Sequence, residues 1–571
     1  MAPEATFISC SLWSADKALN RRKKYSLDWK CLSRSQTRRS HERRVFVCAL
    51  QEGSNNWDVI VIGSGIGGLT AGAMLQRYGK RVLILESHAV PGGAAHSFVR
   101  NGYHFDSGPS FHCGLSEKEA STNPLRQCLD LLGESKSVDY VTYNRWNYYL
   151  PEGLFEVHTN FDQYCDEVQR FSPQGATQLR RLEREISPYH AASREIPAMA
   201  MRADPLIAPM LALRFPLPMA KMLPLAPTIS GPASSIIMRS VSDPFLLRLL
   251  DLECFVLSGL KAEGTIVAEF AFVLGERGES TIDYPLGGGQ AIVGALVRGL
   301  QKYGGQLRCN SHVDKILVEQ GKAVGVRLHS KKAGAVQEEI RAPIVISNAS
   351  IWDTIPLVTD KEWPEGYRQK ALATPTTGSF MHLHLGIRAE GLDPNLLCHH
   401  CVMNDAHADI DAAGNVVIIS IPSIFDPSLA PPGHHCVHAY SAGNEPFDIW
   451  KGLSRSDEQY KALKKERAEP LWRALERVIP DIRSRTTVEL IGTPLTHASY
   501  LRRHRGTYGP AIEAGKESFP SCVTPIESLY HVGDSTMPGI GVPAVAASGI
   551  ICANTIMPFT KHWAMLDCLP S

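Results

Sequence analysis

The sequence lacks several features that would assign it to common classes of protein. Its first 50 residues contain no apolar run of the length that a secretory signal needs. Its 14 cysteines are scattered and only one CxxC pair occurs, which favours reduced thiols over a disulfide framework or a zinc ribbon. No second G-x-G-x-x-G follows residue 86, so no separate NAD(P)H site is expected. No Ser-His-Asp or paired-carboxylate arrangement can be assigned, and the catalytic residues stay unknown at this level.

Positive charge is concentrated in residues 1–50, which hold 11 Lys/Arg against 4 Asp/Glu and therefore carry 11 − 4 = +7. Because the whole chain carries +1, the remaining residues carry +1 − 7 = −6. The first 50 residues also hold seven Ser, and a basic, Ser-rich, acid-poor segment is typical of an organelle transit peptide. The alternative is a disordered basic arm that binds nucleic acid or an anionic membrane.

A nucleotide-binding motif begins directly after this basic segment. Residues 57–62 form an apolar, β-branched run that is typical of a buried parallel strand. The loop GSGIGG follows and satisfies G-x-G-x-x-G, and residues 69–78 continue as a helix rich in Ala, Leu and Met. Residues 81–85 form a second strand, which ends at Glu86. Strand, glycine loop, helix, strand and terminal acid in this order predict a dinucleotide site.

Each residue of the motif has a separable physical role. Gly63 permits the tight turn, Gly65 lets the backbone approach a pyrophosphate, and Gly68 allows the helix to pack close to the sheet. Glu86 is expected to accept hydrogen bonds from the ribose hydroxyls of the adenosine, and its carboxylate would repel a 2′-phosphate. NADP is therefore disfavoured, while FAD and NAD both stay open at this point.

Later segments favour FAD. A loop with little side-chain bulk at Gly92-Gly93 could lie along the pyrophosphate and flavin, followed by the GYHFDSGPS segment. A strand and hairpin over 311–328 lead to a buried strand at 345–349, and a strand over 529–534 precedes a helix with a small-residue start. Asp534 could bind the ribityl chain, and the N–H groups near Gly541 could face the flavin. The predicted cofactor-binding residues are Gly63, Gly65, Ile66, Gly67, Gly68, Glu86, Gly92, Gly93, Asp106, Gly108, Val313, Gly533, Asp534, Gly541 and Val542.

Together these segments resemble the flavin-dependent amine-oxidase/phytoene-desaturase superfamily, in particular its carotenoid isomerase (prolycopene isomerase) branch of plants and cyanobacteria. The resemblance spans about residues 57–556 and includes VIGSGIGG, ESHAVPGGAAHSF, IDYPLGGGQAIVGALVRGLQKYGG, RGTYGPA and GDSTMPGIGVPAVAASG. Within that branch, PGGAAHSF and FDSGPS are closest to the plastid isomerase-like paralogues. The resemblance therefore implies that the organelle is the plastid and that residues 1–50 are a plastid transit peptide.

The activity that the resemblance implies is FAD-dependent cis–trans isomerisation of a carotenoid, a long polyene taken from the membrane, by reduced FAD with no net redox change. Alternatives on the same scaffold are a carotenoid desaturase that passes electrons to a quinone, a saturase and a hydratase. A rival of another class is a flavin-free prenyl-lipid escort protein. That rival predicts a degraded glycine loop, whereas Gly63, Gly65 and Gly68 are all present. No nucleic-acid partner is expected.

The order of the motifs implies an α/β fold with two interleaved domains. The Rossmann-type FAD-binding domain is discontinuous and is expected over 57–155, 281–355 and 490–560. An α+β substrate-binding domain is expected over 156–280 and 356–489.

Residues 197–238 form an apolar segment that cannot be one regular helix. Eight Pro occur between 197 and 232, and six of the 13 Met lie between 199 and 238. No charged residue occurs from Met222 to Met238, but three Pro in that stretch argue against a membrane-spanning helix. We expect a monotopic surface that contacts the plastid membrane peripherally. The alternative is a loop-rich lid that packs on the substrate domain.

Several polar clusters are interpreted as structural. Cys398-His399-His400-Cys401 has ligand-like spacing, but the segment has the pattern of a strand, and no metal is expected. His382 and His384 alternate in another strand and are expected to lie on one side of it. They are interpreted as satisfied core histidines, and the alternative is that they line the substrate tunnel. Arginines 502, 503 and 505 precede a glycine turn and are interpreted as a solvated face rather than a phosphate site, and Tyr508 is placed near the flavin.

Overall fold

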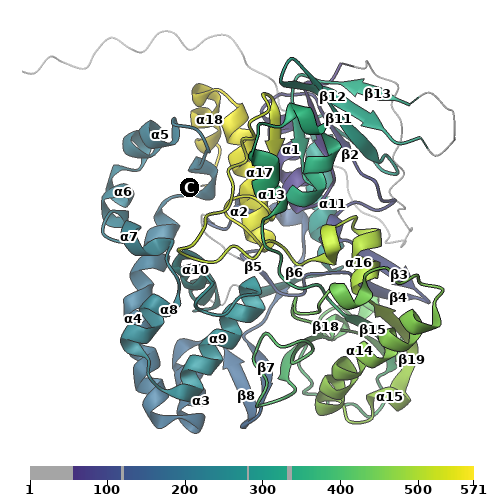
Figure 1. The fold of residues 1–571 in the computed structure, drawn as a ribbon. Helices are drawn as coiled ribbons and strands as arrows, with labels where there is room; N and C mark the ends of the chain where they lie inside the picture. Colours follow the sequence, from purple (N-terminus) through teal and green to yellow (C-terminus); the bar gives the residue numbers. More distant parts are fainter. Residues whose placement is uncertain (1–55, 117–120, 279–281, 331–336, 571) are drawn as a thin grey trace, which may run out of the picture. The chain divides into compact units, whose positions relative to one another are not determined.

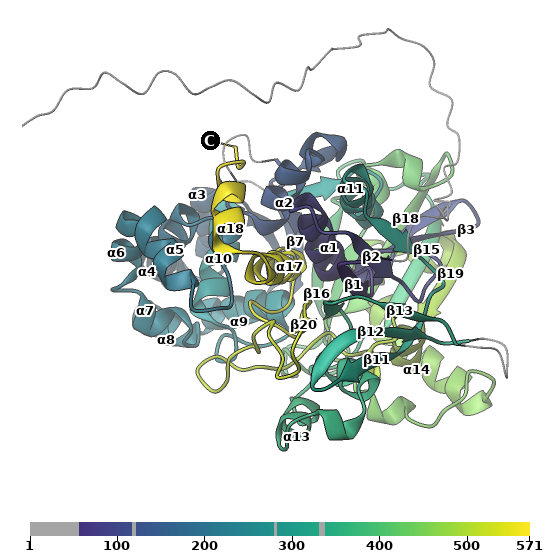
Figure 2. The ribbon, with the colours of Figure 1, turned by 90° about the horizontal axis from the view of Figure 1, so that it is seen from above.

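The computed structural model describes residues 56–116, 121–278, 282–330 and 337–570. These residues lie in one compact unit, Leu50–Ser571. The predicted transit peptide over 1–50 lies outside the described residues, and so does its processing site. Figures 1 and 2 show the arrangement of the helices and strands of this unit.

A five-stranded parallel sheet forms the base of the nucleotide-binding part. Its strand order is β10-β2-β1-β14-β20, so neighbours in the sheet come from distant parts of the chain. The strands β1, β2 and β14 are buried along their whole length, as expected for apolar strands covered on both faces. This sheet confirms the predicted α/β class and the predicted strands. Their bounds are β1 Val59–Ile62, β2 Val82–Leu85, β10 Gln306–Arg308, β14 Val345–Ser347 and β20 Leu529–His531.

Four helices pack together beside this sheet. Helix α1 (Ile66–Arg77) follows the glycine loop, and α17 (Val542–Ile556) lies against it in both views (Figures 1 and 2). Helices α2 (Pro124–Leu132) and α11 (Gly289–Lys302) complete this group. Small side chains on α1 and α17 allow the close approach, because the residues at their contact are mostly Gly and Ala. The other face of the sheet packs on the hairpin β11 (Val313–Glu319) and β12 (Lys322–Leu328), which pairs with β13 (Glu339–Arg341).

A seven-stranded mixed sheet forms the second layer, in the order β19-β15-β18-β17-β16-β7-β8. Helix α14 (Glu458–Val478) covers one face, and α15 (Ile482–Arg485) follows it. The strands are β7 Arg145–Leu150, β8 Gly153–His158, β15 His382–Arg388, β16 His399–Met403, β17 Val416–Ser420, β18 His434–Ser441 and β19 Thr486–Gly492. Strand β7 pairs here with β16, and β8 pairs with β7, although the predicted boundary places most of these two strands in the FAD domain. The division into two domains stays a prediction.

Two small sheets lie between the larger elements. Strand β3 (Ser97–Arg100) pairs with β4 (Tyr103–Asp106). Strand β9 (Ile282–Pro285) joins β5 (His112–Cys113) to β6 (Tyr140–Thr142). These strands connect the early part of the chain with the segment that returns at β9.

Helices α3 to α10 form a separate group at one side of the unit (Figure 1). They are α3 Phe161–Phe171, α4 Pro173–Glu195, α5 Ile207–Arg214, α6 Pro216–Met222, α7 Ala226–Ile229, α8 Ser234–Ser240, α9 Pro244–Ser258 and α10 Val267–Gly278. The apolar segment 197–238 is broken into short helices at its prolines, as predicted. Within the described residues, no helix is both long enough and apolar enough to cross a bilayer.

The remaining helices are short. They are α12 Ile351–Thr354, α13 Tyr367–Leu372, α16 Pro494–Tyr500 and α18 Phe559–Leu566.

The contact between α1 and α17 leads to a stability prediction. A Cβ added at Gly549 would lie 2.5 Å from the carbonyl oxygen of Gly67 and 2.8 Å from the nitrogen of Ala71, both on the backbone of α1. We expect Gly549→Ala to lower the free energy of unfolding by about 1–3 kcal/mol, because α17 must move away from α1. Gly278→Ala is the matched control, since nothing lies within 4 Å of a Cβ at that helical position. Urea denaturation measures both, and equal effects of the two substitutions would contradict the packing argument.

Candidate functional site

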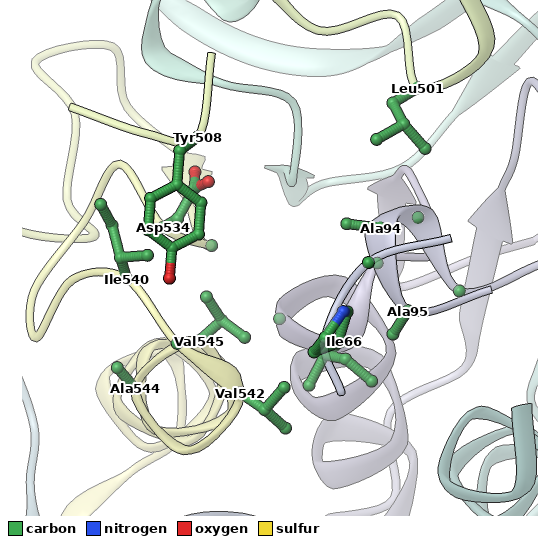
Figure 3. Close-up of a pocket in the computed structure, with 18 of the residues that line it drawn as sticks. Ile66, Ala94, Ala95, Leu501, Tyr508, Asp534, Ile540, Val542, Ala544 and Val545 are labelled. Carbon is green, nitrogen blue, oxygen red and sulfur yellow. The ribbon is translucent and has the colours of Figure 1, made fainter. Parts of the chain in front are cut away.

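A cavity of about 910 Å³ extends from the carboxyl edge of the parallel sheet toward helices α9 and α10. One end is lined by the glycine loop, the start of α1 and the loop before α17. The other end is lined mainly by apolar side chains. Figure 3 shows Ile66, Ala94 and Ala95 on one side of the cavity and Tyr508, Ile540 and Val545 on the other. The cavity thus joins a dinucleotide-type loop to an apolar channel.

The glycine loop brings backbone N–H groups to the cavity. Gly63 has φ +90°, which allows the chain to turn sharply out of β1. Gly65 is the N-cap of α1, and no side chain caps this helix end. The free N–H groups and the helix dipole therefore favour a negatively charged group at this place. This arrangement fits the pyrophosphate of a dinucleotide.

Close packing around Asn348 explains why the loop is rich in glycine. Asn348 follows β14, and its side-chain nitrogen would lie 2.7 Å from a Cβ at Gly65. Its side-chain oxygen would lie 2.9 Å from a Cβ at Gly67 and at Gly533. A Cβ at Gly68 would lie 2.3 Å from the carbonyl oxygen of Gly63. Sequence reasoning missed Asn348, although its place at the end of a parallel strand on the same sheet edge was a usable signal.

Glu86 lies at the end of β2 and lines the cavity. One carboxylate oxygen accepts hydrogen bonds from Ser64, from the backbone N–H at 2.9 Å and from the hydroxyl at 2.6 Å. The other oxygen accepts the N–H of His88 at 2.7 Å. These bonds hold the carboxylate in place at the edge of the cavity. Ser64 is a second residue that sequence reasoning did not single out.

The Gly92-Gly93 loop lies directly over the glycine loop. The N–H of Gly92 donates to the carbonyl oxygen of Ser64 at 3.0 Å, and a Cβ at Gly93 would lie 3.1 Å from the Cα of Gly65. Residues 93–95 form one short 3₁₀ turn. The loop was predicted to lie along the cofactor, and the structure brings it to the cavity.

The segment before α17 forms the opposite wall. Gly541 is the N-cap of α17, and no side chain caps this helix, so its N–H groups are free toward the cavity. Asp534 forms an ion pair with Arg503, whose guanidinium also donates to the carbonyl oxygens of Thr507 and Tyr508. Arg503 is half-buried and lines the cavity, so its interpretation as part of a solvated face is wrong. Arg505 instead pairs with the exposed Asp448.

Most of the predicted cofactor-binding residues meet at this cavity. Those that line it are Gly63, Gly65, Ile66, Gly67, Glu86, Gly92, Gly93, Gly108, Val313, Gly533, Asp534, Gly541 and Val542. Gly68 does not line it, because its role is the close packing of α1. Asp106 does not line it either. Its carboxylate accepts hydrogen bonds from Ser97 at 2.6 Å, from the N–H of Gly289 at 3.0 Å and from Tyr284 at 3.3 Å. Asp106 therefore joins β4 to the start of α11.

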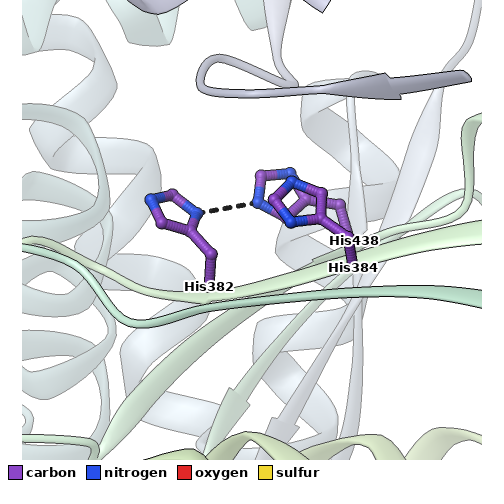
Figure 4. Close-up of side chains that lie close together, drawn as sticks. All are labelled: His382, His384 and His438. Carbon is purple, nitrogen blue, oxygen red and sulfur yellow. Dashed lines mark hydrogen bonds between the residues drawn. The ribbon is translucent and has the colours of Figure 1, made fainter. Parts of the chain in front are cut away.

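Four neutral histidines lie beside the cavity. His382 and His384 are buried on the same side of β15, as predicted, and the Nδ1 of His382 lies 2.9 Å from the Nε2 of His438 (Figure 4). The rings of His384 and His438 stack with centroids 4.1 Å apart and 9° between planes. Burial lowers the pKa of His384 to about 4 and that of His497 to about 3. The expectation of satisfied partners is wrong for His382, because its Nε2 is buried without a hydrogen-bond partner among the described residues.

The nitrogens of His382, His384 and His438 lie within 4.8 Å of one another, a spacing that could hold a metal ion. However, the rings of His384 and His438 stack nearly parallel. The lone pairs of their nitrogens therefore lie in parallel planes and do not converge on one point, as the ligands of a metal ion must. The Cys398–Cys401 cluster lies on and beside β16. There the Nε2 of His399 contacts the carbonyl oxygen of Ser110 at 3.0 Å, and the Nε2 of His400 contacts that of Leu397 at 2.8 Å. Those partners agree with a structural role.

Comparison with known proteins identifies related sequences and folds. The family model of the NAD(P)-binding Rossmann-like domain matches residues 61–128, which hold the glycine loop and Glu86. The chain is 34% identical to Prolycopene isomerase 2, chloroplastic, of an Oncidium hybrid cultivar over 528 residues, covering 90% of this chain and 87% of that protein. It is 33% identical to the chloroplastic prolycopene isomerase of Arabidopsis thaliana over 515 residues, 88% of this chain and 83% of that protein.

Among solved structures, an oxidoreductase from Methanosarcina mazei has the same fold, with a TM-score of 0.55 and 19% sequence identity over 86% of this chain and 98% of that one.

The buried histidines make stability depend on pH. Burial lowers the pKa of eight of them. The pKa is about 4 for His112, His384, His400 and His562, about 3 for His399 and His497, and well below the usual value for His382 and His438. Below about pH 6.5 the unfolded chain binds protons that the folded chain does not, so each histidine removes about 1.4 kcal/mol of stability per pH unit. We expect the free energy of unfolding to fall steeply between pH 6.5 and 5.

Urea denaturation at a series of pH values measures this slope. His112→Phe removes one titrating ring and should reduce the slope by about one proton. A free energy of unfolding that is constant from pH 7 to 5 would contradict the expectation.

Proposed function

This chain belongs to the prolycopene isomerase family, and on that premise we propose that it is a carotenoid cis–trans isomerase that works with FAD in the plastid. The observation that carries the proposal is that a dinucleotide-type loop and an apolar channel line one continuous cavity. An isomerase of long polyenes needs both parts next to each other.

The residues at the loop end fit FAD. Glu86 would hold the ribose hydroxyls of the adenosine, and the free N–H groups at the start of α1 would hold the pyrophosphate. Asp534 would bind the ribityl chain, with its carboxylate positioned by Arg503. The uncapped start of α17 at Gly541 would face the flavin ring. When bound and reduced, the flavin supplies electron density beside the conjugated chain.

The apolar end of the cavity fits a hydrocarbon polyene. Its lining includes Trp146, Val256, Leu257, Phe270 and Val273, which offer surface for dispersion and no charge. With no second dinucleotide loop in the sequence, a reaction without net redox change suits the chain. This supports isomerisation over a reaction that consumes NAD(P)H.

Membrane contact is a further part of the proposal. Leu213, Leu217 and Leu223 lie on or just after α5 and α6, and they are 69%, 75% and 67% exposed. Three large apolar side chains within eleven positions of an exposed, Pro-broken segment are typical of a surface that dips into a bilayer. A peripheral contact there would let the polyene pass from the membrane toward the cavity.

The function is tested with the purified full chain, reduced FAD and prolycopene in detergent micelles without oxygen. We expect the protein purified in air to be yellow because its FAD is then oxidised, and we expect the anaerobic reaction with reduced FAD to give a product of unchanged mass with altered double-bond geometry. A product that has lost or gained two hydrogens would indicate a desaturase or saturase, and one that has gained a water would indicate a hydratase. A colourless protein that binds prenyl lipid would indicate an escort protein. Each of these outcomes contradicts the proposal.

The membrane contact is tested by liposome flotation of the triple variant Leu213→Asp, Leu217→Asp, Leu223→Asp. We expect the bound fraction to fall at least tenfold, since three charges must enter the interface. Val99→Asp, Leu372→Asp, Val523→Asp is the matched control, because these apolar residues are also exposed but lie outside the segment. Equal loss in both variants, or none in either, would contradict the assignment of this surface.

A further inference from the structure

Among the residues that the structure describes, five carboxyl side chains line the cavity, and four of them have partners. Glu86 is held by Ser64, and Asp534 is paired with Arg503. Glu253 forms an ion pair with Arg277 at 2.5 Å. Asp353 accepts hydrogen bonds from the hydroxyl of Ser350 and from the backbone N–H of His504. Glu269 alone makes no hydrogen bond or ion pair with any residue that the structure describes. An unpaired carboxyl in an enclosed site is costly unless it is neutral.

Glu269 lies in the first turn of α10, at the apolar part of the cavity. Its neighbours along this helix, Ala268, Phe270 and Val273, line the same space, and the side chain of Glu269 is exposed only in part. Burial of its carboxyl raises the pKa of Glu269 to about 7. Because the apolar surroundings of Glu269 disfavour the charged carboxylate, its carboxyl keeps its proton near neutral pH.

The titratable groups that face Glu269 do not compete as acids. Tyr508, from the segment after α16, and Cys254, from α9, both have a raised pKa because of burial, with the negative charge of Glu269 as a further cause. The hydroxyl of Tyr508 donates to the carbonyl oxygen of Leu257 at 3.3 Å. The cavity histidines His382 and His497 are neutral because burial lowers their pKa, so neither is a proton donor of suitable strength.

We propose that Glu269 is the acid and base of the isomerisation: its neutral carboxyl gives a proton to a carbon of the conjugated chain and then takes one back. This rests on the proposed function. A C–H bond forms as the O–H bond breaks, and the positive charge spreads over the polyene. The order of the double bonds falls, so a cis bond rotates. The carboxylate then removes a proton from the same carbon, and no electron is gained or lost. The product keeps the mass of the substrate.

Deuterium labelling tests this step. The carboxyl proton exchanges with D₂O before turnover, so the atom donated to the polyene is deuterium. Because a C–H bond breaks faster than a C–D bond, deuterium stays in part of the product. We expect the full chain with reduced FAD and prolycopene in D₂O to give an isomerised product that carries deuterium.

The matched variants are Glu269→Gln, which keeps the shape but has no acidic proton, and Glu263→Gln, at an exposed glutamate six residues earlier. We expect Glu269→Gln to isomerise at least 100-fold more slowly and to incorporate no deuterium, with an unchanged flavin content. Glu263→Gln should behave as the unmodified chain. Isomerisation without deuterium uptake, or undiminished uptake in Glu269→Gln, would overturn the proposal.

A readout that does not depend on activity is the infrared carbonyl band of a protonated carboxyl. We expect a band that titrates with a midpoint near pH 7 and is missing in Glu269→Gln. A Glu269 that is ionised from pH 5 upward would overturn the proposal. If the unmodified chain does not isomerise prolycopene, the proposed function fails, while the infrared titration still decides whether Glu269 holds the proton.

Discussion

The close approach of backbone to backbone at the carboxyl edge of the parallel sheet is the constraint on which the site depends. The loop after β1 passes within van der Waals contact of Asn348, and α17 lies on the first turns of α1 at Gly549. Side chains at Gly65, Gly67 or Gly549 would separate these segments. Only with them in contact do two uncapped helix starts, those of α1 and α17, open into one cavity. The same glycines that let these segments pack closely therefore also bring the helix starts that could bind an anion into one cavity.

The two ends of the cavity differ in how many charged groups line them. At the loop end, carboxylates are fixed by hydrogen bonds and by Arg503, which suits the polar groups of a dinucleotide. Farther along, the lining is apolar, and the histidines beside it are neutral because burial disfavours their charged form. The charged groups that a hydrocarbon meets there include Glu253 and Arg277, which neutralise each other as an ion pair. In that setting a lone carboxyl such as Glu269 keeps its proton, and its chemistry differs from that of Glu86 only because of its surroundings.

Local sequence patterns predicted much of the fold because they report on neighbours along the chain. The apolar strand at 59–62, the glycine loop and the helix after it follow one another directly along the chain. Strands β11, β12 and β20 also lie where their local sequence patterns predicted them. The alternation of His382 and His384 correctly placed both on one face of a strand. Asp106 shows the limit of such patterns. Its motif suggested a cofactor contact, but its carboxylate is bound by Ser97 on the paired strand β3 and by residues 284 and 289, which come from a distant segment.

By itself, the sequence determined the dinucleotide loop, the family and the breaks that prolines impose on residues 197–238. These depend on glycine, proline and apolar spacing, which act locally. The tertiary structure decided that Arg503 meets Asp534 and that Asn348 fills the space beside the glycine loop. It also decided that Glu269 faces the cavity without a partner. The physical reason is that the hydrogen-bond partners of a side chain and its removal from water both depend on which distant segments fold together. A local sequence pattern contains neither kind of information.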